Sequence, residues 1–342
     1  NQELRRKDVT SADMLGSSPA FRTLKAQLEK VTKSNGRVML TGPSGSGKEV
    51  AARFIHAHSN RASAPFVSVS SATIEPDRME EVLFGRETSE RGVERGLLEQ
   101  AHGGVVYFDE VADMPLGTQS KILRVLVEQQ FLRVGGADKV RVDLRVISST
   151  TRDLRAEIAA GRFRQELYDR LNVVPIPVPS LEERREDIPD LTRHFIEMFN
   201  RSQGLPLRKL TGEAEALLQT SPWPGNVRQL RNVIERVLIL GEGTGPIEAG
   251  ELPGQETAAE TGGRLVLGGA MATLPLREAR EVFEREYLLT QINRFGGNIS
   301  RTANFVGMER SALHRKLKSL GVVTTSKSGG RAAHFDEADD EE

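Results

Sequence analysis

The sequence predicts an α/β domain with a parallel sheet, followed by an all-helical domain and a second, smaller all-α domain. Up to Pro179, short Val- and Ile-rich runs alternate with helical patterns, which indicates βαβ units. After Pro179 only helical spacing appears. A glycine-rich stretch at 241–269 then separates the last helical patterns. With 342 residues, the chain is also too long for one ordinary core.

Each element is expected where apolar residues recur with the period of a strand or a helix. The expected strands are the runs at 37–41, 66–69, 105–108, 144–147 and 173–178. The expected helices after the sheet are 188–200, 212–220 and 226–240, then 276–294, 300–306 and 310–320. The expected parts are 1–10, the end of a linker helix; 11–179, the α/β domain; 180–245, a helical lid; 246–272, a flexible linker; 273–321, a helix-turn-helix domain; and 322–342, a disordered acidic tail.

Composition narrows the class of protein. Lys and Arg number 47 against 48 Asp and Glu, so no global charge points to nucleic acid or a membrane. Basic residues nevertheless outnumber acidic ones in 277–320, which favours a local nucleic-acid-facing module. The absence of Cys excludes disulfides, thiolate zinc sites and cysteine nucleophiles. No long apolar run or leader is seen, so we expect a cytoplasmic protein without a membrane partner.

A phosphate-binding loop is expected between the first strand and the next helix. The run Gly-Pro-Ser-Gly-Ser-Gly-Lys-Glu follows the strand at 37–41, and helical spacing begins at Val50. Glycines let backbone N–H groups turn inward, and the lysine reaches the outer phosphates. The alternative is a chance glycine-rich turn, which this placement disfavours. The expected nucleotide-binding residues here are Gly42, Pro43, Ser44, Gly45, Ser46, Gly47, Lys48 and Glu49.

Two acids end the apolar strand at 105–108. In P-loop ATPases, the first such acid, here Asp109, holds Mg²⁺ through water, and the second, here Glu110, polarises the attacking water. On their own, Asp109 and Glu110 would indicate a solvated charged turn at the end of a strand. The phosphate loop upstream favours the catalytic interpretation instead. Glu49 stands where Ser or Thr usually holds the metal, so Mg²⁺ depends more on Asp109 and water.

The last two helices fit a helix-turn-helix. Asn298 is a plausible N-cap and Gly307 makes the turn. The alternative is an amphipathic dimerisation bundle with a solvated basic face. The expected contacts to double-stranded DNA are Arg301, Arg310, Ser311, His314, Arg315 and Lys318. The preceding helix carries apolar residues suited to pairing two copies over an inverted repeat, namely Phe283, Tyr287, Leu288 and Ile292.

Together these motifs resemble the AAA+ ATPase activators that act on sigma-54 RNA polymerase in bacteria. The matching segments cover nearly all of residues 14–240: 15–20, 42–49, 83–85, 103–115, 123–126, 133–136, 162–172 and 223–235. The segments 297–303 and 307–317 are similar to a response regulator of the nitrogen-linked two-component systems. The resemblance implies an AAA+ domain with a helical lid, a Fis-type helix-turn-helix, ATP or ADP with Mg²⁺, and ring oligomers. It also implies RNA polymerase as a partner and a histidine kinase acting through a receiver domain upstream of this chain.

The resemblance also assigns roles to single residues. Lys48 matches the phosphate-binding lysine, Asp109 the Mg²⁺ residue and Glu110 the water-activating residue. The pair from which the family supplies an arginine finger to the neighbouring subunit corresponds to Arg164 and Arg170, and the sensor arginine of the lid to Arg228. A finger supplied in trans makes hydrolysis depend on assembly.

Three departures from the family pattern are visible. The family's sigma-54 loop carries Gly-Ala-Phe-Thr-Gly-Ala, whereas residues 86–96 here are charged, shorter and lack it. Ser70 and Thr151 stand where two Asn residues are usual, and a hydroxyl lacks the reach and second donor of an amide. We therefore expect ATP binding, weakened or differently regulated hydrolysis, and no sigma-54 contact of the usual kind.

Three functions remain open at this point. The first is a DNA-bound response regulator in which ATP controls oligomeric state and transcription. The second is an ATP-hydrolysing sigma-54 activator that opens promoters. The third is a P-loop ATPase that remodels another protein and uses its C-terminal helices only for dimerisation. The missing sigma-54 motif favours the first.

Overall fold

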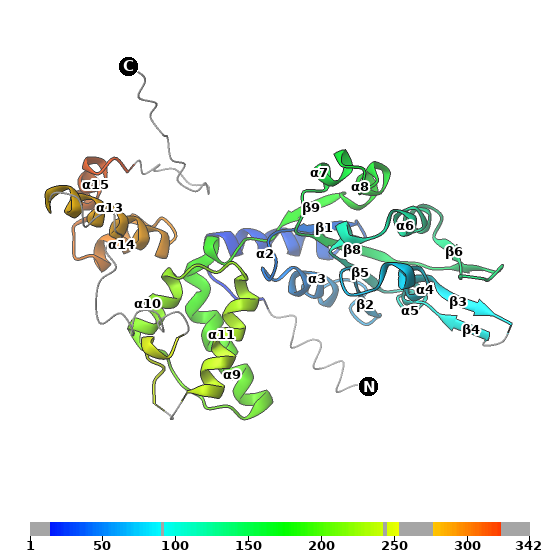
Figure 1. The fold of residues 1–342 in the computed structure, drawn as a ribbon, viewed down its shortest axis with the longest axis horizontal. Helices are drawn as coiled ribbons and strands as arrows, with labels where there is room; N and C mark the ends of the chain where they lie inside the picture. Colours follow the sequence, from blue (N-terminus) through cyan, green and yellow to red (C-terminus); the bar gives the residue numbers. More distant parts are fainter. Residues whose placement is uncertain (1–13, 90–91, 242–244, 253–275, 323–342) are drawn as a thin grey trace, which may run out of the picture. The chain divides into compact units, whose positions relative to one another are not determined.

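The computed structural model describes residues 14–89, 92–241, 245–252 and 276–322 (Figure 1). The chain forms two compact units. The described part of the first unit comprises 14–16, 21–180 and 224–229, and the second comprises the remainder. The expected linker-helix end at 1–10, the linker from 253 onward and nearly all of the expected tail at 322–342 lie outside the described residues.

The first unit is built on a five-stranded sheet in which every neighbouring pair of strands is parallel. The strand order is β2 (Phe66–Ser70), β5 (Val105–Asp109), β8 (Arg145–Thr150), β1 (Val38–Thr41) and β9 (Val174–Pro177). The predicted parallel α/β fold is confirmed, and all five strands fall on the predicted apolar runs.

Alternating side chains of β1, β5 and β8 fill two cores, one on each face of the sheet. In β1, Val38 and Leu40 belong to one core, and Met39 belongs to the other. The core of Val38 is covered by α2 (Pro19–Thr32) and α3 (Lys48–Ala57). The core of Met39 is covered by α4 (Met79–Phe84), α5 (Leu97–Gln100), α6 (Leu116–Glu128), α7 (Leu154–Ala159) and α8 (Gln165–Leu171). The carboxyl ends of β1, β5 and β8 therefore meet at one edge.

Two antiparallel hairpins in this unit were not predicted. They are β3 (Gly85–Thr88) with β4 (Gly92–Arg95), and β6 (Gln130–Leu132) with β7 (Lys139–Arg141). These strands are only three or four residues long and mix glycine, polar, charged and apolar residues, so no strand period is visible in the sequence. The hairpins are joined by backbone hydrogen bonds from Glu87 N to Val134 O (2.9 Å) and from Val134 N to Gly85 O (3.0 Å).

The first helices of the second unit include three that were predicted: α9 (Ile188–Gln203), α10 (Gly212–Thr220) and α11 (Asn226–Leu240), whose first turn belongs to the first unit. Two short helices, η3 (Glu182–Asp187) and η4 (Ala249–Glu251), were not predicted. Phe199 and Ile234 are fully buried in their core. The structure differs from the expected linker at its start: Ile247 is buried and bridges Leu210, and Arg208 forms an ion pair with Glu251 at 2.7 Å.

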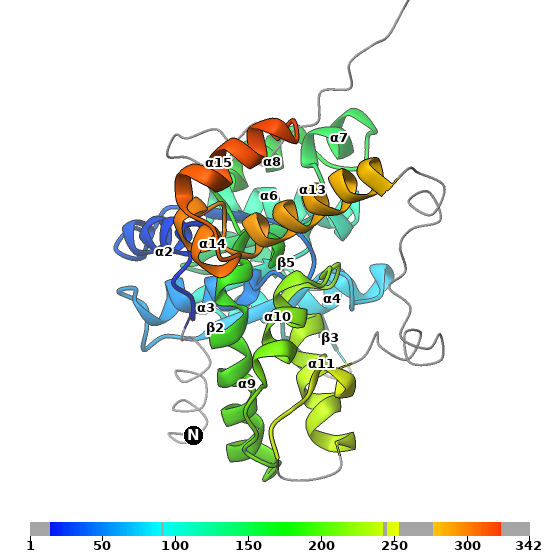
Figure 2. The same ribbon diagram turned by 90° about the vertical axis from the view of Figure 1, so that its left-hand side faces the viewer.

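The C-terminal part is a three-helix group made of α13 (Leu276–Arg294), α14 (Ile299–Phe305) and α15 (Arg310–Ser319) (Figure 2). Leu288 and Ile292 of α13 pack with Leu313 and Leu317 of α15 in its core. The expectation that Leu288 and Ile292 pair two copies is therefore wrong, because the chain's own fold buries them. In the portion of the chain that is described, no helix has the length and apolarity needed to cross a membrane.

Candidate functional site

The turn between β1 and α3 forms a tight loop in which two glycines are required by space. A Cβ on Gly42 would lie 2.4 Å from the carbonyl oxygen of Val178, and one on Gly45 would lie 2.3 Å from that of Gly225. Gly45 also has φ +74°, in the left-handed region that favours glycine. Only glycine fits at these two positions, as a loop that wraps a phosphate requires.

Lys48 lies at the start of α3 with its ammonium directed back into this loop. Its side chain is only 6 % exposed, and Nζ donates to the carbonyl oxygens of Gly42 (3.0 Å) and Pro43 (3.3 Å). Nζ also lies 3.3 Å from Oε1 of Glu110, at the end of β5. The fold thus brings the predicted phosphate-binding lysine and the predicted water-activating glutamate together, although they are far apart in sequence.

Ser46 of the loop and Glu49 of α3 differ in how they could serve a phosphate group and its cation. Ser46 Oγ is buried and, within the described residues, has no hydrogen-bond partner. A buried hydroxyl without a partner is costly, so this atom suits a phosphate oxygen or a metal-bound water. Glu49 instead is exposed and forms an ion pair with Arg53 at 2.9 Å. The residues present therefore fit a nucleotide phosphate with a cation held from the Asp109 side.

Asp109 and Glu110 differ sharply in their surroundings. Oδ1 of Asp109 accepts hydrogen bonds from Tyr107 Oη (2.8 Å) and Ser149 Oγ (2.6 Å). Glu110 has a backbone φ of +54°, which a non-glycine residue adopts only when its surroundings enforce it. The strained backbone turns the Glu110 side chain out of the strand and toward Lys48.

Thr151, the residue that follows β8, holds Glu110 in this position. The backbone N and Oγ1 of Thr151 each lie 2.9 Å from Oε2 of Glu110. Ser70, which occupies the position where the related ATPases have an Asn facing the glutamate, forms no hydrogen bond with Glu110 in the described structure. The two positions singled out in the sequence are therefore not equivalent, because only Thr151 reaches the carboxylate.

The first turn of α11 closes the site from a different part of the chain. Arg228 donates from Nη1 to Ser44 Oγ (3.3 Å) and from its backbone N to Gly45 O (3.2 Å). Asn226, which is buried and has φ +51°, donates from Nδ2 to Ser44 O at 2.9 Å. The predicted sensor arginine, Arg228, therefore lies against the phosphate loop. The contact of Asn226 with this loop was not predicted, because in the sequence Asn226 indicates only the start of a helix.

The two candidate finger arginines lie apart from this cluster in a single chain. Both are exposed. Arg164 precedes α8 and donates from Nε to Leu116 O at 3.3 Å. Within the described residues, the guanidinium of Arg170 forms no hydrogen bond, and neither arginine forms a hydrogen bond or ion pair with Lys48 or Glu110. Both side chains are therefore open to solvent in the single chain.

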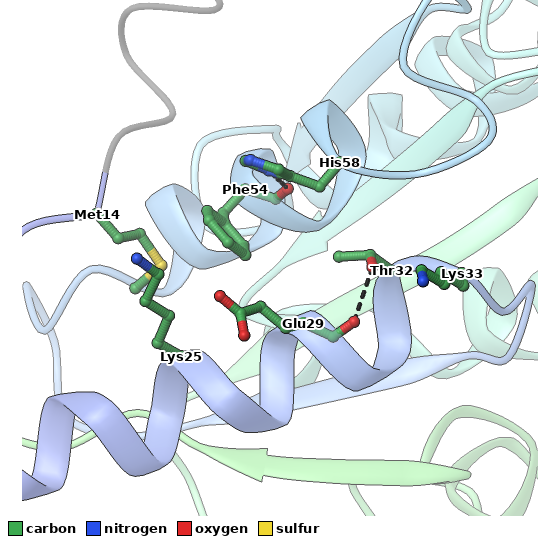
Figure 3. Close-up of a pocket in the computed structure, with 7 residues that line it drawn as sticks. All are labelled: Met14, Lys25, Glu29, Thr32, Lys33, Phe54 and His58. Atoms are coloured by element: carbon green, nitrogen blue, oxygen red, sulfur yellow. Dashed lines mark hydrogen bonds between the residues drawn. The ribbon is translucent and has the colours of Figure 1, made fainter.

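A cavity of about 490 Å³ lies between α2 and α3, separate from the phosphate loop (Figure 3). It is lined by Met14, Lys25, Glu29, Thr32, Lys33, Phe54 and His58. Some of its polar groups are engaged locally: Thr32 Oγ1 donates to Glu29 O at 2.8 Å, and His58 Nδ1 lies 2.9 Å from Phe54 O. His58 is about 15 Å along the helix from Lys48, so this cavity is no part of the phosphate site.

The recognition surface of the helix-turn-helix is exposed and basic. Oδ1 of Asn298 accepts from Arg301 N at 3.1 Å, so the expected N-cap of α14 is present, and Gly307 makes the turn with φ +70°. Leu313 and Leu317 bury the inner face of α15. All six predicted DNA-contacting side chains are exposed: Arg301, Arg310, Ser311, His314, Arg315 and Lys318. A helix with an apolar inner face and this outer face suits the major groove.

Fold and site together define a P-loop AAA+ protein with a helical lid and a C-terminal helix-turn-helix. Residues 14–177 match the sigma-54 interaction domain, 182–264 the AAA+ ATPase lid domain and 279–320 the Fis family of bacterial regulatory proteins.

Full-length relatives support the same classification. The chain is 57 % identical over 318 residues to the nitrogen assimilation regulatory protein NtrX of Azorhizobium caulinodans, covering 90 % of this chain and 69 % of that protein. It is 38 % identical over 333 residues to the DNA-binding transcriptional regulator NtrC of Escherichia coli K12, covering 91 % and 71 %. The chain therefore belongs to the NtrX/NtrC family of two-component regulators.

Solved structures of a related protein support the same family assignment. The crystal structure of NtrX from Brucella abortus is 54 % identical with a TM-score of 0.82, covering 90 % of this chain and 69 % of that one. The same protein in complex with ATP has a TM-score of 0.81 at 54 % identity, covering 94 % and 72 %. A complex with ADP gives the same values.

Proposed function

We propose that this chain is a DNA-binding transcriptional regulator in which ATP, bound by the AAA+ domain, controls oligomeric state and thereby transcription. The observation that carries the proposal is the closed arrangement of Lys48, Glu110 and Arg228 around a loop that only glycine can form. The ATP and ADP complexes of the Brucella protein support the choice of ligand. The proposed upstream partner is a histidine kinase, and the proposed target is RNA polymerase.

The proposed cation is Mg²⁺, held from the side of Asp109. No group of three or more His, Asp or Glu side chains suited to a metal occurs among the described residues. Mg²⁺ commonly takes one or two carboxylates and completes its shell with phosphate and water, so a single Asp109 suffices with a nucleotide. When bound, the cation would neutralise phosphate charge. The chain's own contribution is to orient Asp109 and to hold Glu110 near the loop.

The hairpin of β3 and β4 argues against sigma-54 contact of the usual kind. It lacks the aromatic and threonine tip of the family, and its strand β3 is tied to the segment after β6 by Arg133, which also pairs with Glu99 of α5. The Arg133 side chain is 14 % exposed and lies 3.1 Å from Glu99 and 3.3 Å from Glu87. The hairpin is therefore a short, charged and anchored element, which fits a regulator that reaches the polymerase by another route.

Oligomerisation is proposed to complete the nucleotide site. Arg164 and Arg170 are exposed and make no ion pair with the site in one chain, as expected for a finger that acts on a neighbouring subunit. A dimer is further proposed through α13, where the rings of Phe283 and Tyr287 are stacked at 6.2 Å and are 45 % and 40 % exposed. A dimer would place two copies of α15 on an inverted repeat.

The test is ATP turnover as a function of protein concentration. We expect turnover to rise more than linearly, and to fall strongly in either Arg164→Ala or Arg170→Ala. Arg162→Ala is the matched control, because Arg162 lies in the same segment but is engaged by Glu157 at 2.7 Å. Nucleotide binding without turnover would leave ATP as a ligand that switches assembly, to be checked by sedimentation with and without ATP. Failure to bind nucleotide would overturn the proposal.

The second candidate is an ATP-hydrolysing sigma-54 activator that opens promoters. The match of residues 14–177 to the sigma-54 interaction domain favours it. Transcription in vitro from a sigma-54 promoter decides between the two. ATP-dependent open complexes with this chain would establish the second function, whereas DNA binding without open complexes supports the first.

A further inference from the structure

Two buried hydroxyl groups meet the carboxylate of Asp109. Tyr107 Oη lies 2.8 Å and Ser149 Oγ lies 2.6 Å from the same oxygen, Oδ1. The two hydroxyls also contact each other at 2.9 Å. Tyr107 and Ser149 are both fully buried, so water does not compete for these hydrogen bonds. Neither residue was singled out in the sequence, where Tyr107 stands within an apolar run.

The sheet register explains why these three side chains converge. Tyr107 and Asp109 are two residues apart on β5 and therefore share one face of the sheet. The pairing of Phe108 with Ser148 places the following residue of β8, Ser149, beside Asp109 on that same face. This is the face covered by α3, which begins with Lys48. The hydroxyl pair therefore lies beneath the phosphate site.

The donors and acceptors of this cluster can be assigned by counting hydrogens. Each hydroxyl has one hydrogen to donate. Ser149 Oγ accepts from the backbone N of Glu110 at 3.3 Å, so its own hydrogen is left for Asp109. The hydrogen of Tyr107 Oη also goes to Asp109, because a carboxylate is a stronger acceptor than the neighbouring hydroxyl. Within the described residues, Oδ2 of Asp109 forms no hydrogen bond.

We propose that Tyr107 and Ser149 are positioning residues that occupy Oδ1 of Asp109 and thereby reserve Oδ2 for the cation of the bound nucleotide. The inference rests on the proposed function, since it concerns the cation that accompanies ATP. Two hydroxyl donors fix the rotamer of the carboxylate and hold its charge in place. Partners of this kind orient a carboxylate that ligates a metal or its waters, and their loss weakens the affinity for the metal.

The alternative is that the hydroxyls only satisfy one another in a buried core, without consequence for the cation. Ser148 provides a matched control for that alternative. It lies on the same strand and is equally buried, but its hydroxyl contacts Val38 O and Met39 Sδ, each at 3.4 Å, and does not reach Asp109. Ser148→Ala, like Ser149→Ala, removes a buried hydroxyl from β8, but we expect no effect of Ser148→Ala on cation binding.

The experiment measures nucleotide affinity with and without Mg²⁺ in the full chain. The β,γ-imido analogue of ATP is titrated by calorimetry in Mg²⁺ and in excess EDTA, for the unmodified chain, Tyr107→Phe, Ser149→Ala and Ser148→Ala. We expect Tyr107→Phe and Ser149→Ala each to reduce the Mg²⁺ enhancement of affinity about tenfold. Affinity in EDTA should change by less than about twofold in both, and Ser148→Ala should keep the enhancement.

The outcomes separate this inference from the proposed function. An unchanged Mg²⁺ enhancement in folded Ser149→Ala overturns the inference, even if Tyr107→Phe proves too unstable to measure. A nucleotide affinity that is independent of Mg²⁺ in the unmodified chain also overturns it. An unmodified chain that binds no nucleotide overturns the proposed function itself. The double variant provides a further check: because both hydroxyls act on one oxygen, its loss should be smaller than the product of the two single losses.

Discussion

Thr151 donates two hydrogen bonds to one oxygen of the Glu110 carboxylate, from its backbone N and from its Oγ1, each at 2.9 Å from Oε2. The other oxygen, Oε1, lies 3.3 Å from Lys48 Nζ. Glu110 is therefore fixed between a threonine and an ammonium group, with a strained backbone that keeps it there. A phosphate group that binds the Lys48 ammonium would compete with the Glu110 carboxylate for that ammonium. Nucleotide binding and the position of Glu110 are therefore coupled.

The first prediction concerns the hydroxyl of Thr151. Thr151→Val removes Oγ1 and keeps the backbone donor, so we expect single-turnover ATP hydrolysis to slow about tenfold, the equivalent of one hydrogen bond to a charged group. Thr151→Asn should instead hydrolyse faster than the unmodified chain, because an amide adds reach and a second donor. Ser70→Ala is the control, since Ser70 does not hydrogen-bond to Glu110. Equal rates in Thr151→Val and the unmodified chain would contradict the prediction.

The second prediction separates the backbone and side-chain contributions of Asn226. Asn226→Ala should lower the free energy of unfolding by about 1–2 kcal/mol, because alanine is disfavoured at a positive φ. Asn226→Gly accepts that φ and should largely restore the stability. Both variants lose the hydrogen bond to Ser44 O, so both should bind the ATP analogue about fivefold more weakly.

Denaturant unfolding and calorimetry check these two effects independently. If Asn226→Gly recovers nucleotide affinity together with stability, then Asn226 serves the backbone turn alone. The comparison requires no assumption about catalysis.

Period and motif were enough to predict the five strands of the large sheet and the main helices of the second unit. The run at 105–108 is apolar because both faces of its strand are buried, and the run at 144–147 is apolar except for the buried Arg145. The helices at 212–220 and 226–240 carry one apolar face each. The two hairpins could not be predicted in this way. Their strands are held by backbone pairing and by Arg133, and such a long-range ion pair leaves no periodic signal.

The candidate site was predictable only where it follows a local motif. Lys48 and Asp109 are in recognisable runs, whereas Tyr107 and Ser149 depend on the register of two strands that are far apart in sequence. Asn226 depends on the return of α11 to the phosphate loop. A tyrosine inside an otherwise apolar strand was the one available signal, because a buried phenol requires a hydrogen-bond partner.

The third prediction concerns the anchor of the β3–β4 hairpin. Arg133→Ala would leave Glu99 and Glu87, which are 15 % and 30 % exposed, without their shared partner. We expect a loss of about 1–3 kcal/mol in the free energy of unfolding. Arg95→Ala is the matched control: Arg95 also pairs with Glu99, at 3.2 Å, but is 75 % exposed, so its removal should cost less than about 1 kcal/mol.

Hydrogen exchange provides the local check. Arg133→Ala should increase exchange in β3 and β4 more than in the central strands. Equal stability of the Arg133 and Arg95 variants would show that the hairpin is held by backbone pairing alone.

The last prediction distinguishes residues of α15 that read bases from those that meet phosphates. Arg310 and His314 are exposed on the N-terminal half of the helix, where a recognition helix meets base edges, and Lys318 lies near its end. Arg310→Ala should cost about 1–3 kcal/mol on the preferred operator and little on random DNA. Lys318→Ala should weaken binding to both and reduce the salt slope by about one unit. Arg280→Ala, an exposed arginine of α13, is the control. Binding titrations over a range of salt concentrations measure all of these, and loss of affinity for both DNAs in Arg310→Ala would place Arg310 on the phosphate backbone instead.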